Sequence, residues 1–236
     1  MRADGTTVIS SALAERVASL GVPAERILRI PQGSDVVAVV PRDRDASRAR
    51  LNLPLDVPIV GYLGVLLNSD AALLAGAWRG IKERHPDARL VMIGNPKSVL
   101  DGPAVTMTGF VPRDEMVSYL AACDVLLLPM KNTIASRGRW PSKLNDYMAA
   151  GRPVAATAVG DSSVLFGDDG IGVATADNPD AFAAGVSSLL NDAELRRRMG
   201  ERARSVAENQ FAWPALTQRL EAYYQTVIDR VGGAAE

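Results

Sequence analysis

The sequence holds few of the residues that most often carry catalysis or cross-links. Its 236 residues include one cysteine, Cys123, and one histidine, His85. A single cysteine excludes an internal disulfide and fits a reducing compartment. A catalytic thiol is disfavoured too, because the only histidine lies in a Glu-Arg-His-Pro turn. We therefore expect Cys123 to be a small apolar core residue beside a strand.

Charge bias and long apolar runs are also lacking. The formal net charge is −1, with 26 Lys and Arg against 27 Asp and Glu, so neither nucleic acid nor an anionic membrane is indicated as the main partner. No apolar run is long enough to cross a bilayer, and residues 1–10 show no signal-peptide pattern. These features predict a soluble, cytoplasmic protein that can bury one good core.

From residue 58 onward, short apolar segments alternate with helical patterns. Strands are expected at residues 59–63, 90–93, 105–108, 125–128, 154–157 and 172–174. Helices are expected at residues 70–84, 114–122, 141–150, 162–166, 179–190, 192–209 and 213–231. Short, continuously apolar strands separated by helices indicate an α/β fold with a doubly wound parallel sheet and helices on both faces.

The first part of the chain has a different organisation. Residues 8–10 and 26–30 are expected to be short strands, and Ser10 or Ser11 can cap a helix that runs to about Leu20. We divide the chain into four parts. These are residues 1–40, a linker with a short helix at 41–57, the α/β domain at 58–210, and a C-terminal helix at 211–236. Turns are expected at residues 95–97 and 168–169, and the last residues should fray.

The stretch 140–157, WPSKLNDYMAAGRPVAAT, carries the clearest local signals. Pro141 fits the first turn of a helix, because its missing N–H would be unbonded there. Gly151 is the expected left-handed helix stop. The apolar face of the helix is formed by Leu144, Tyr147 and Met148. A polar segment thus leads to a helix start, and that helix leads directly into a strand.

Several polar residues near this helix start are candidate ligands for a phosphorylated molecule. A helix start attracts phosphate, Lys143 would add a full charge, and Asp146 could accept hydrogen bonds from sugar hydroxyls. The loop 131–139 is cationic and has no acidic residue, so it would attract a diphosphate or an anionic sugar. The alternatives are a flexible solvated loop and a surface carboxylate at Asp146.

Two further sites, Ser142 and the segment that begins at Asp161, each allow two interpretations. Ser142 could bind phosphate or act only as a helix cap, and Asp161, with the two serines after it, could form a phosphate or sugar rim or only a cap.

Several motifs, in the same order, resemble the C-terminal half of GT-B glycosyltransferases of family 4, also called group 1. The run that starts at Asp146, DYMAAGRPVAA, is similar to the donor-nucleotide segment of that family. The other similar stretches are VGYLG at 60–64, TGFVP at 108–112, ACDVLLLP at 122–129 and FAW at 211–213. The resemblance implies a Rossmann-like domain that binds a nucleoside-diphosphate sugar.

The resemblance also implies roles for individual residues. Phe110 and Val111 would line the base pocket, Gly64 would let the backbone approach the diphosphate, and Asp146 would bind the ribose. The implied reaction transfers a sugar from the nucleoside-diphosphate donor to an acceptor hydroxyl. It needs no metal and no cofactor, and no cluster of metal ligands is visible in the sequence.

The sequence departs from the family pattern in two places. Eight residues before Asp146 the family has a glutamate, but here Gly138 stands. The family's arginine and lysine after the first glycine turn are also missing, and the positions read Tyr62, Leu67, Asn68 and Ser69. Arg139 or Lys143 would have to supply the positive charge.

The N-terminal domain of a GT-B enzyme is nearly absent, and its last strand, up to Ser10, would have no sheet to join. We therefore expect donor binding, with little or no transfer by this chain alone. Residues 1–40 and the last helix should carry apolar surface that the missing domain would cover. The expected partner is therefore that domain, or a second copy of this chain through self-association. A non-catalytic nucleotide-binding or interaction module remains an alternative. A nucleotide-sugar epimerase of the same architecture ranks last.

Overall fold

The structure, a computed structural model, describes residues 3–66, 68–94, 100–167 and 170–232. The turns expected at residues 95–97 and 168–169, and the frayed end from residue 233, lie outside these ranges. So does Leu67, one of the positions where a family cation is missing.

A six-stranded sheet forms the centre of the described chain, and every strand pairing in it is parallel. Its order is β5 (Val105–Gly109), β4 (Arg89–Ile93), β3 (Ile59–Leu63), β6 (Val125–Leu128), β7 (Val154–Thr157) and β8 (Gly172–Thr175). The chain runs outward from β3 to β5, then returns to the other side of β3. The doubly wound α/β prediction is thus confirmed, and the strand order reverses between β3 and β6. At such a switch point the carboxyl ends of the strands leave a crevice.

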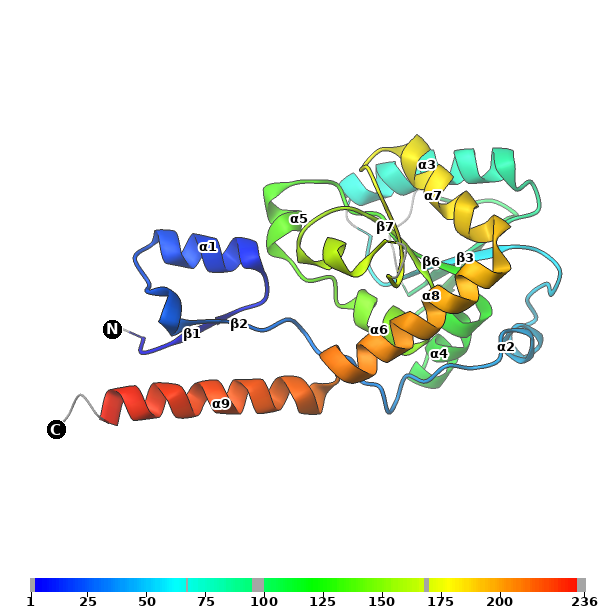
Figure 1. Cartoon of the computed structure of the whole chain (residues 1–236). Coiled ribbons are helices and arrows are strands. Elements are labelled where there is room, and N and C mark those ends of the chain that lie inside the picture. The colour runs from blue at the N-terminus through cyan, green and yellow to red at the C-terminus, as the bar shows by residue number, and fades with distance from the viewer. Residues whose placement is uncertain (1–2, 67, 95–99, 168–169, 233–236) are drawn as a thin grey trace.

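Helices cover both faces of this sheet. Figure 1 shows α3 (Asn68–Arg84) and α7 (Pro179–Asn191) on one side, with α4 (Arg113–Ala122) and α6 (Lys143–Ala149) on the other. Successive residues of β4 alternate between two buried clusters. Leu90 and Met92 join the cluster with α3 and α7, and Val91 and Ile93 join the one with α4 and α6. This alternation explains why the strands read as continuously apolar in the sequence.

The first residues and the last helix form a small unit beside the domain (Figure 1). It contains β1 (Thr6–Val8), α1 (Ser11–Ser19), the 3-10 turn η1 (Ala24–Arg26), β2 (Ile27–Arg29) and α9 (Trp213–Gly232). The expectation that the first strand has no sheet to join is wrong, because β1 pairs in parallel with β2. Ser10 caps α1 as expected, and its side chain accepts a hydrogen bond from the Leu13 N–H.

The two ends of the described chain are tied together within this unit. The Tyr223 hydroxyl on α9 accepts from the Thr6 N–H at 3.1 Å and donates to the Arg26 carbonyl at 2.6 Å. The two segments that enter and leave the unit also run side by side. The Ser34 N–H donates to the Phe211 carbonyl at 2.6 Å, and a Cβ added at Gly33 would meet the Trp213 ring at 2.6 Å.

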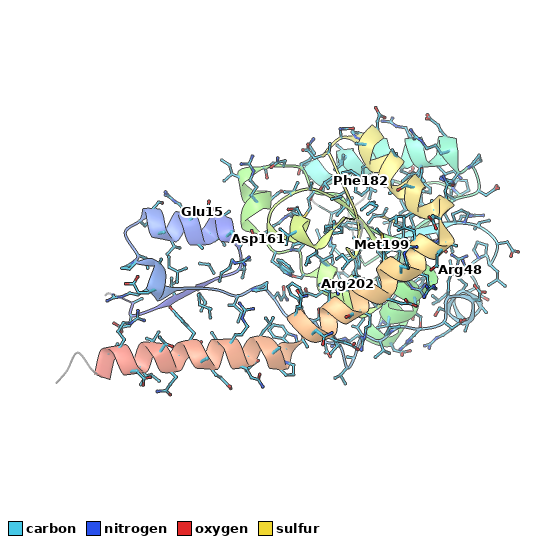
Figure 2. The ribbon with its side chains drawn as sticks, in the orientation of Figure 1. Glu15, Arg48, Asp161, Phe182, Met199 and Arg202 are labelled. Carbon is cyan, nitrogen blue, oxygen red and sulfur yellow. The ribbon has the colours of Figure 1, made fainter. Side chains whose placement is uncertain are left out.

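The segment at 41–57 carries α2 (Arg44–Arg50), which packs against α4. Arg48 in this helix is fully buried and forms an ion pair with Asp124 at 2.7 Å. Its guanidinium also donates to backbone carbonyls, including that of Ala122 at 2.9 Å. Figure 2 shows Arg48 at the end of the domain far from α1. A buried arginine therefore holds this segment on the domain.

The structure corrects the sequence prediction near α6 in two places. The segment expected as a loop contains a short helix, α5 (Ile134–Gly138), because the Thr133 side chain accepts from the Ser136 N–H at 3.0 Å. The helix expected from Pro141 begins at Lys143. The Leu144 N–H bonds the Pro141 carbonyl at 2.9 Å, and this three-residue spacing makes a tight turn ahead of the α-helix.

Two other helical segments also differ from expectation. Residues 162–166 form the 3-10 turn η2 (Asp161–Leu165). The long helix expected at 192–209 is α8 (Ala193–Val206), followed by the π-helical turn η3 (Ala207–Phe211).

Candidate functional site

A hollow of about 260 Å³ lies at the carboxyl end of the sheet, where the strand order reverses. Its walls come from the segments after β3 and β6 and from the turn that enters α6. The lining residues are Tyr62, Val65, Asp70, Leu128, Pro129, Met130, Arg139, Trp140, Pro141, Ser142 and Lys143. Three of the predicted ligands, Arg139, Ser142 and Lys143, are thus brought together.

Lys143 is the most strongly perturbed group in this hollow. Its Nζ lies 3.8 Å from the centre of the Tyr62 ring and donates hydrogen bonds to the Tyr62 hydroxyl and, at 3.4 Å, to the Val65 carbonyl. Burial, with a smaller effect from the nearby Arg139, lowers the pKa of Lys143 to about 7. Among the described residues no carboxylate pairs with it. The Asp70 carboxylate raises this pKa with the smallest of the three effects, but it pairs with Arg139. An anion in the hollow would therefore meet an ammonium that has no ion-pair partner of its own.

Arg139 is the second cation of the hollow, and its charge is largely compensated. Its guanidinium pairs with Asp70 at 2.8 Å, and Asp70 is only 3% exposed. The other Asp70 oxygen accepts from the Lys131 N–H at 2.9 Å. The Nε of Arg139 is buried without a hydrogen-bond partner in the described chain, so one donor remains for a ligand.

Ser142 lines the hollow, and Gly64 directly precedes Val65, which also lines it. The Ser142 hydroxyl lies 2.5 Å from the side-chain oxygen of Gln32 and makes no capping bond to α6. Gly64 has φ +88°, a conformation that favours glycine, and a Cβ there would lie 3.9 Å from the Lys143 Cε. Gly61 has a different reason to be glycine, since its Cβ would meet the Cys123 sulfur at 2.4 Å.

The remaining predicted ligands lie outside the hollow. Phe110 is 86% exposed, whereas Val111 is half-buried and packs on the core. Burial raises the pKa of Asp146 to about 6; the carboxylate of Asp35 adds to this and Arg113 opposes it. Arg113, whose charge affects Asp146, begins α4 directly after the turn at 110–112. The helix α6 therefore carries two candidate ligands, Lys143 in the hollow and Asp146 outside it.

Sequence reasoning missed several residues around the site. It did not foresee Asp70 as the partner of Arg139, or Tyr62 as the ring under Lys143. Asp70 lies in the first turn of the helix after β3, and that position, at the carboxyl edge of the sheet, was an available signal. The contact between Gln32 and Ser142 joins residues 110 positions apart, and no local pattern predicts it.

Asp161 and Gly138 contact the N-terminal unit. One Asp161 oxygen accepts from the Ser11 N–H at 2.7 Å and pairs with Arg29 at 2.8 Å. The Ser10 hydroxyl donates to the Gly138 carbonyl at 2.8 Å. A Cβ at Gly138 would make only ordinary contact with Leu13, at 3.7 Å. Figure 2 shows Asp161 on the side of the domain that faces α1. In this structure Asp161 anchors the small unit.

The described residues contain neither a cluster of metal ligands nor a membrane-spanning helix. No group of three or more His, Cys, Asp or Glu side chains is arranged to hold a metal ion. None of the described helices combines the length and apolar character needed to span a membrane. Cys123 is buried, as expected, and burial raises its thiol pKa to about 12, which leaves it protonated and unreactive.

The fold and the site define a doubly wound α/β domain with a cation-lined hollow at its switch point. A family model described as Glycosyl transferases group 1 matches residues 57–192, more than half of the chain. The chain therefore belongs to the group 1 glycosyl transferases, and the resemblance in the motifs is confirmed.

Similar proteins agree with this assignment. D-inositol 3-phosphate glycosyltransferase of Kineococcus radiotolerans is 28% identical over 89% of this chain and 54% of its own length. Sucrose-phosphate synthase from Thermosynechococcus elongatus has a TM-score of 0.79 at 22% identity, over 97% of this chain and 59% of that one. Anabaena HepE, solved in complex with UDP-glucose, has a TM-score of 0.77 at 17% identity, over 95% and 64%. The chain spans about half the length of the curated relatives it matches.

Proposed function

We propose that this chain is the donor-binding part of a glycosyltransferase that moves a sugar from a nucleoside-diphosphate sugar to an acceptor hydroxyl. The observation that carries the proposal is the position of Lys143. Its ammonium lies in a hollow at the switch point of a doubly wound sheet and has no carboxylate partner in the described chain. That location is where such folds bind nucleotides.

The diphosphate would occupy the hollow and draw the ammonium of Lys143 away from the Tyr62 hydroxyl. The free Nε–H of Arg139 would donate a second hydrogen bond. Both cations would then stabilise the charge that develops on the diphosphate as the sugar leaves. This chemistry needs neither a metal nor a further cofactor.

The nucleoside would extend toward the turn at 110–112. Phe110, largely exposed, offers a ring face to a base, and Val111 offers an apolar edge. Asp146 lies in α6 three residues after Lys143 and is affected by the charge of Arg113, and it would accept from the ribose hydroxyls. At pH 7 the carboxylate is mostly ionised, because its pKa of about 6 lies below the pH of the solution.

Calorimetry with UDP-, GDP- and ADP-glucose tests this assignment at pH 7. We expect one of the three donors to bind, and K143M to weaken it roughly 10- to 100-fold, the value of one charge-assisted hydrogen bond in a buried site. The matched control is K82M. Lys82 also lies over an aromatic ring, that of Trp78 at 5.8 Å, but it does not line the hollow.

Two outcomes would refute the assignment. One is the absence of binding by all three donors at millimolar concentration. The other is binding that K143M and K82M weaken equally. The proposal that the chain alone transfers little or no sugar is separate, and robust turnover by the purified chain would refute only that part.

A non-catalytic nucleotide-binding or interaction module is the second candidate. It is favoured by Gly138, which stands where the family has a glutamate, and by the Asp70 carboxylate that compensates Arg139. The calorimetry separates the two proposals. Tight binding of nucleotide sugars supports a donor site, whereas free nucleoside diphosphates binding equally well would indicate a module that does not recognise the sugar.

A further inference from the structure

A second and larger hollow lies at the opposite, amino-terminal edge of the sheet. Its volume is about 520 Å³, and its walls come from the segment before β7, the start of α2 and one face of α8. Five arginines line it: Arg44, Arg152, Arg196, Arg197 and Arg204. An adjoining hollow of about 300 Å³ shares Arg44, Asp124 and Arg196 with it. The adjoining hollow also holds Asp56, an exposed carboxylate with no ion pair among the described residues. We call the larger hollow alone the arginine groove.

The carboxylates of the groove are already paired. Asp124 is shared between Arg44, at 3.0 Å, and the buried Arg48, at 2.7 Å. Of the other two, Glu201 pairs with Arg197 at 2.6 Å, and Glu208 pairs with Arg204 at 2.7 Å.

Arg152 and Arg196 therefore have no carboxylate partner among the described residues. Arg196 donates to the carbonyls of Leu189 and Leu190 near the end of α7, at 2.7 and 2.6 Å. Arg152 donates to the Arg42 carbonyl at 2.8 Å. Its Nε is buried and has no hydrogen-bond partner among the residues that the structure describes. Burial, and the nearby Arg44 and Arg48, lower the pKa of Arg152. The charged guanidinium of Arg152 is thus held in surroundings that disfavour its charge.

Helix ends do not fully offset these charges. The C-terminus of a helix carries about half a negative charge. Arg196 bonds such an end, that of α7, whereas the last carbonyl of α6 is bonded by Arg204. The charges of Arg152 and Arg196 are therefore opposed by about half a negative charge, and at least about one positive charge stays uncompensated in the groove. A cavity that keeps an unpaired cation and an unused donor is suited to an anion.

We propose that the arginine groove binds a small phosphate monoester, at a site separate from the sheet edge that carries Lys143. Guanidinium groups match phosphate oxygens through paired N–H donors. The groove is larger than a phosphate group requires, and apolar side chains also line it, among them Pro41, Ala150 and Pro153. The ligand would therefore carry a compact apolar body beside its phosphate.

The arginine side-chain Nε–H signals in ¹H–¹⁵N NMR spectra report on this groove directly. Phenyl phosphate and inorganic phosphate are titrated at pH 7.5 and constant ionic strength, with the Arg152 and Arg196 signals assigned by substitution. We expect saturable shifts of both signals, and phenyl phosphate should bind more tightly than inorganic phosphate. R196Q should weaken phenyl phosphate binding roughly tenfold.

R198Q is the matched control, because Arg198 lies on the same helix but is exposed and does not line the groove. If R196Q fails to fold, R196K keeps the charge without the planar donor fork and should give a smaller loss. The proposal is overturned if the Arg152 signal shows no saturable shift at about 10 mM phenyl phosphate, a concentration that would detect even weak binding. Equal losses in R196Q and R198Q would overturn it as well.

Discussion

Replacing Lys143 by methionine should make the protein more stable at acidic and neutral pH. Lys143 has a folded-state pKa of about 7 against its ordinary value of 10.5, so holding it charged in the fold costs about 5 kcal/mol at 1.36 kcal/mol per pKa unit. Its contact with the Tyr62 ring offsets about 1–2 kcal/mol of that cost. Methionine keeps the length of the side chain and removes the charge. We expect K143M to gain about 3 kcal/mol at pH 6.

The pH dependence of this gain identifies its cause. Between pH 7 and 10.5 the unfolded chain keeps a proton on Lys143 that the folded chain has released. Wild-type stability therefore rises with pH across this window because of this group. The advantage of K143M should shrink to below about 1 kcal/mol near pH 9.5, as the lysine becomes neutral in the fold.

Urea unfolding of both proteins, followed by tryptophan fluorescence between about pH 6 and 9.5, measures the difference. Titration of groups common to the two proteins cancels in the comparison. A gain that does not change with pH would show that methionine improves packing instead. A K143M protein less stable than wild type at pH 6 would refute the claim that the charge is held at a cost.

Three further outcomes are expected. Nucleotide-sugar affinity should be highest between about pH 6 and 7, because Asp146 loses its charge below this window and Lys143 above it; calorimetry across this range would contradict the assignment if affinity were flat. R48M should lower the unfolding free energy by about 3–5 kcal/mol, since Asp124 and several carbonyls lose a buried partner; a loss below about 1 kcal/mol in urea would show that Arg44 alone suffices. G61A should cost about 1–3 kcal/mol because its Cβ would meet the Cys123 sulfur at 2.4 Å, and C123A should restore part of this loss in thermal melts.

The sequence predicted the sheet well because local patterns determine it. Strands β3, β6 and β7 have the expected bounds, since each is a short apolar run buried on both sides. Ser10 and Gly151 marked a helix start and a helix stop through side-chain capping and a left-handed conformation. The boundaries of α6 were missed because a tight turn at Pro141 shares the sequence signals of a helix start.

The candidate site was predicted only in part, because its electrostatics depend on pairs distant in the chain. The cationic loop identified Arg139, but the carboxylate that compensates it, Asp70, comes from a segment 69 residues earlier. The depressed pKa of Lys143 follows from burial against Tyr62, 81 residues away. The arginine groove was missed for the same reason, because its arginines come from α2, from the segment before β7 and from α8, which are far apart in the chain.

The Tyr223 hydroxyl has a consequence for the handling of this protein. Because one phenol joins β1 to the turn before β2, the first thirty or so residues depend on the last twenty for their shape. Truncating the protein between Trp213 and Tyr223 would remove this phenol, and the loss of structure would be seen near Thr6. Its opposite ends therefore have to be kept or removed as a pair.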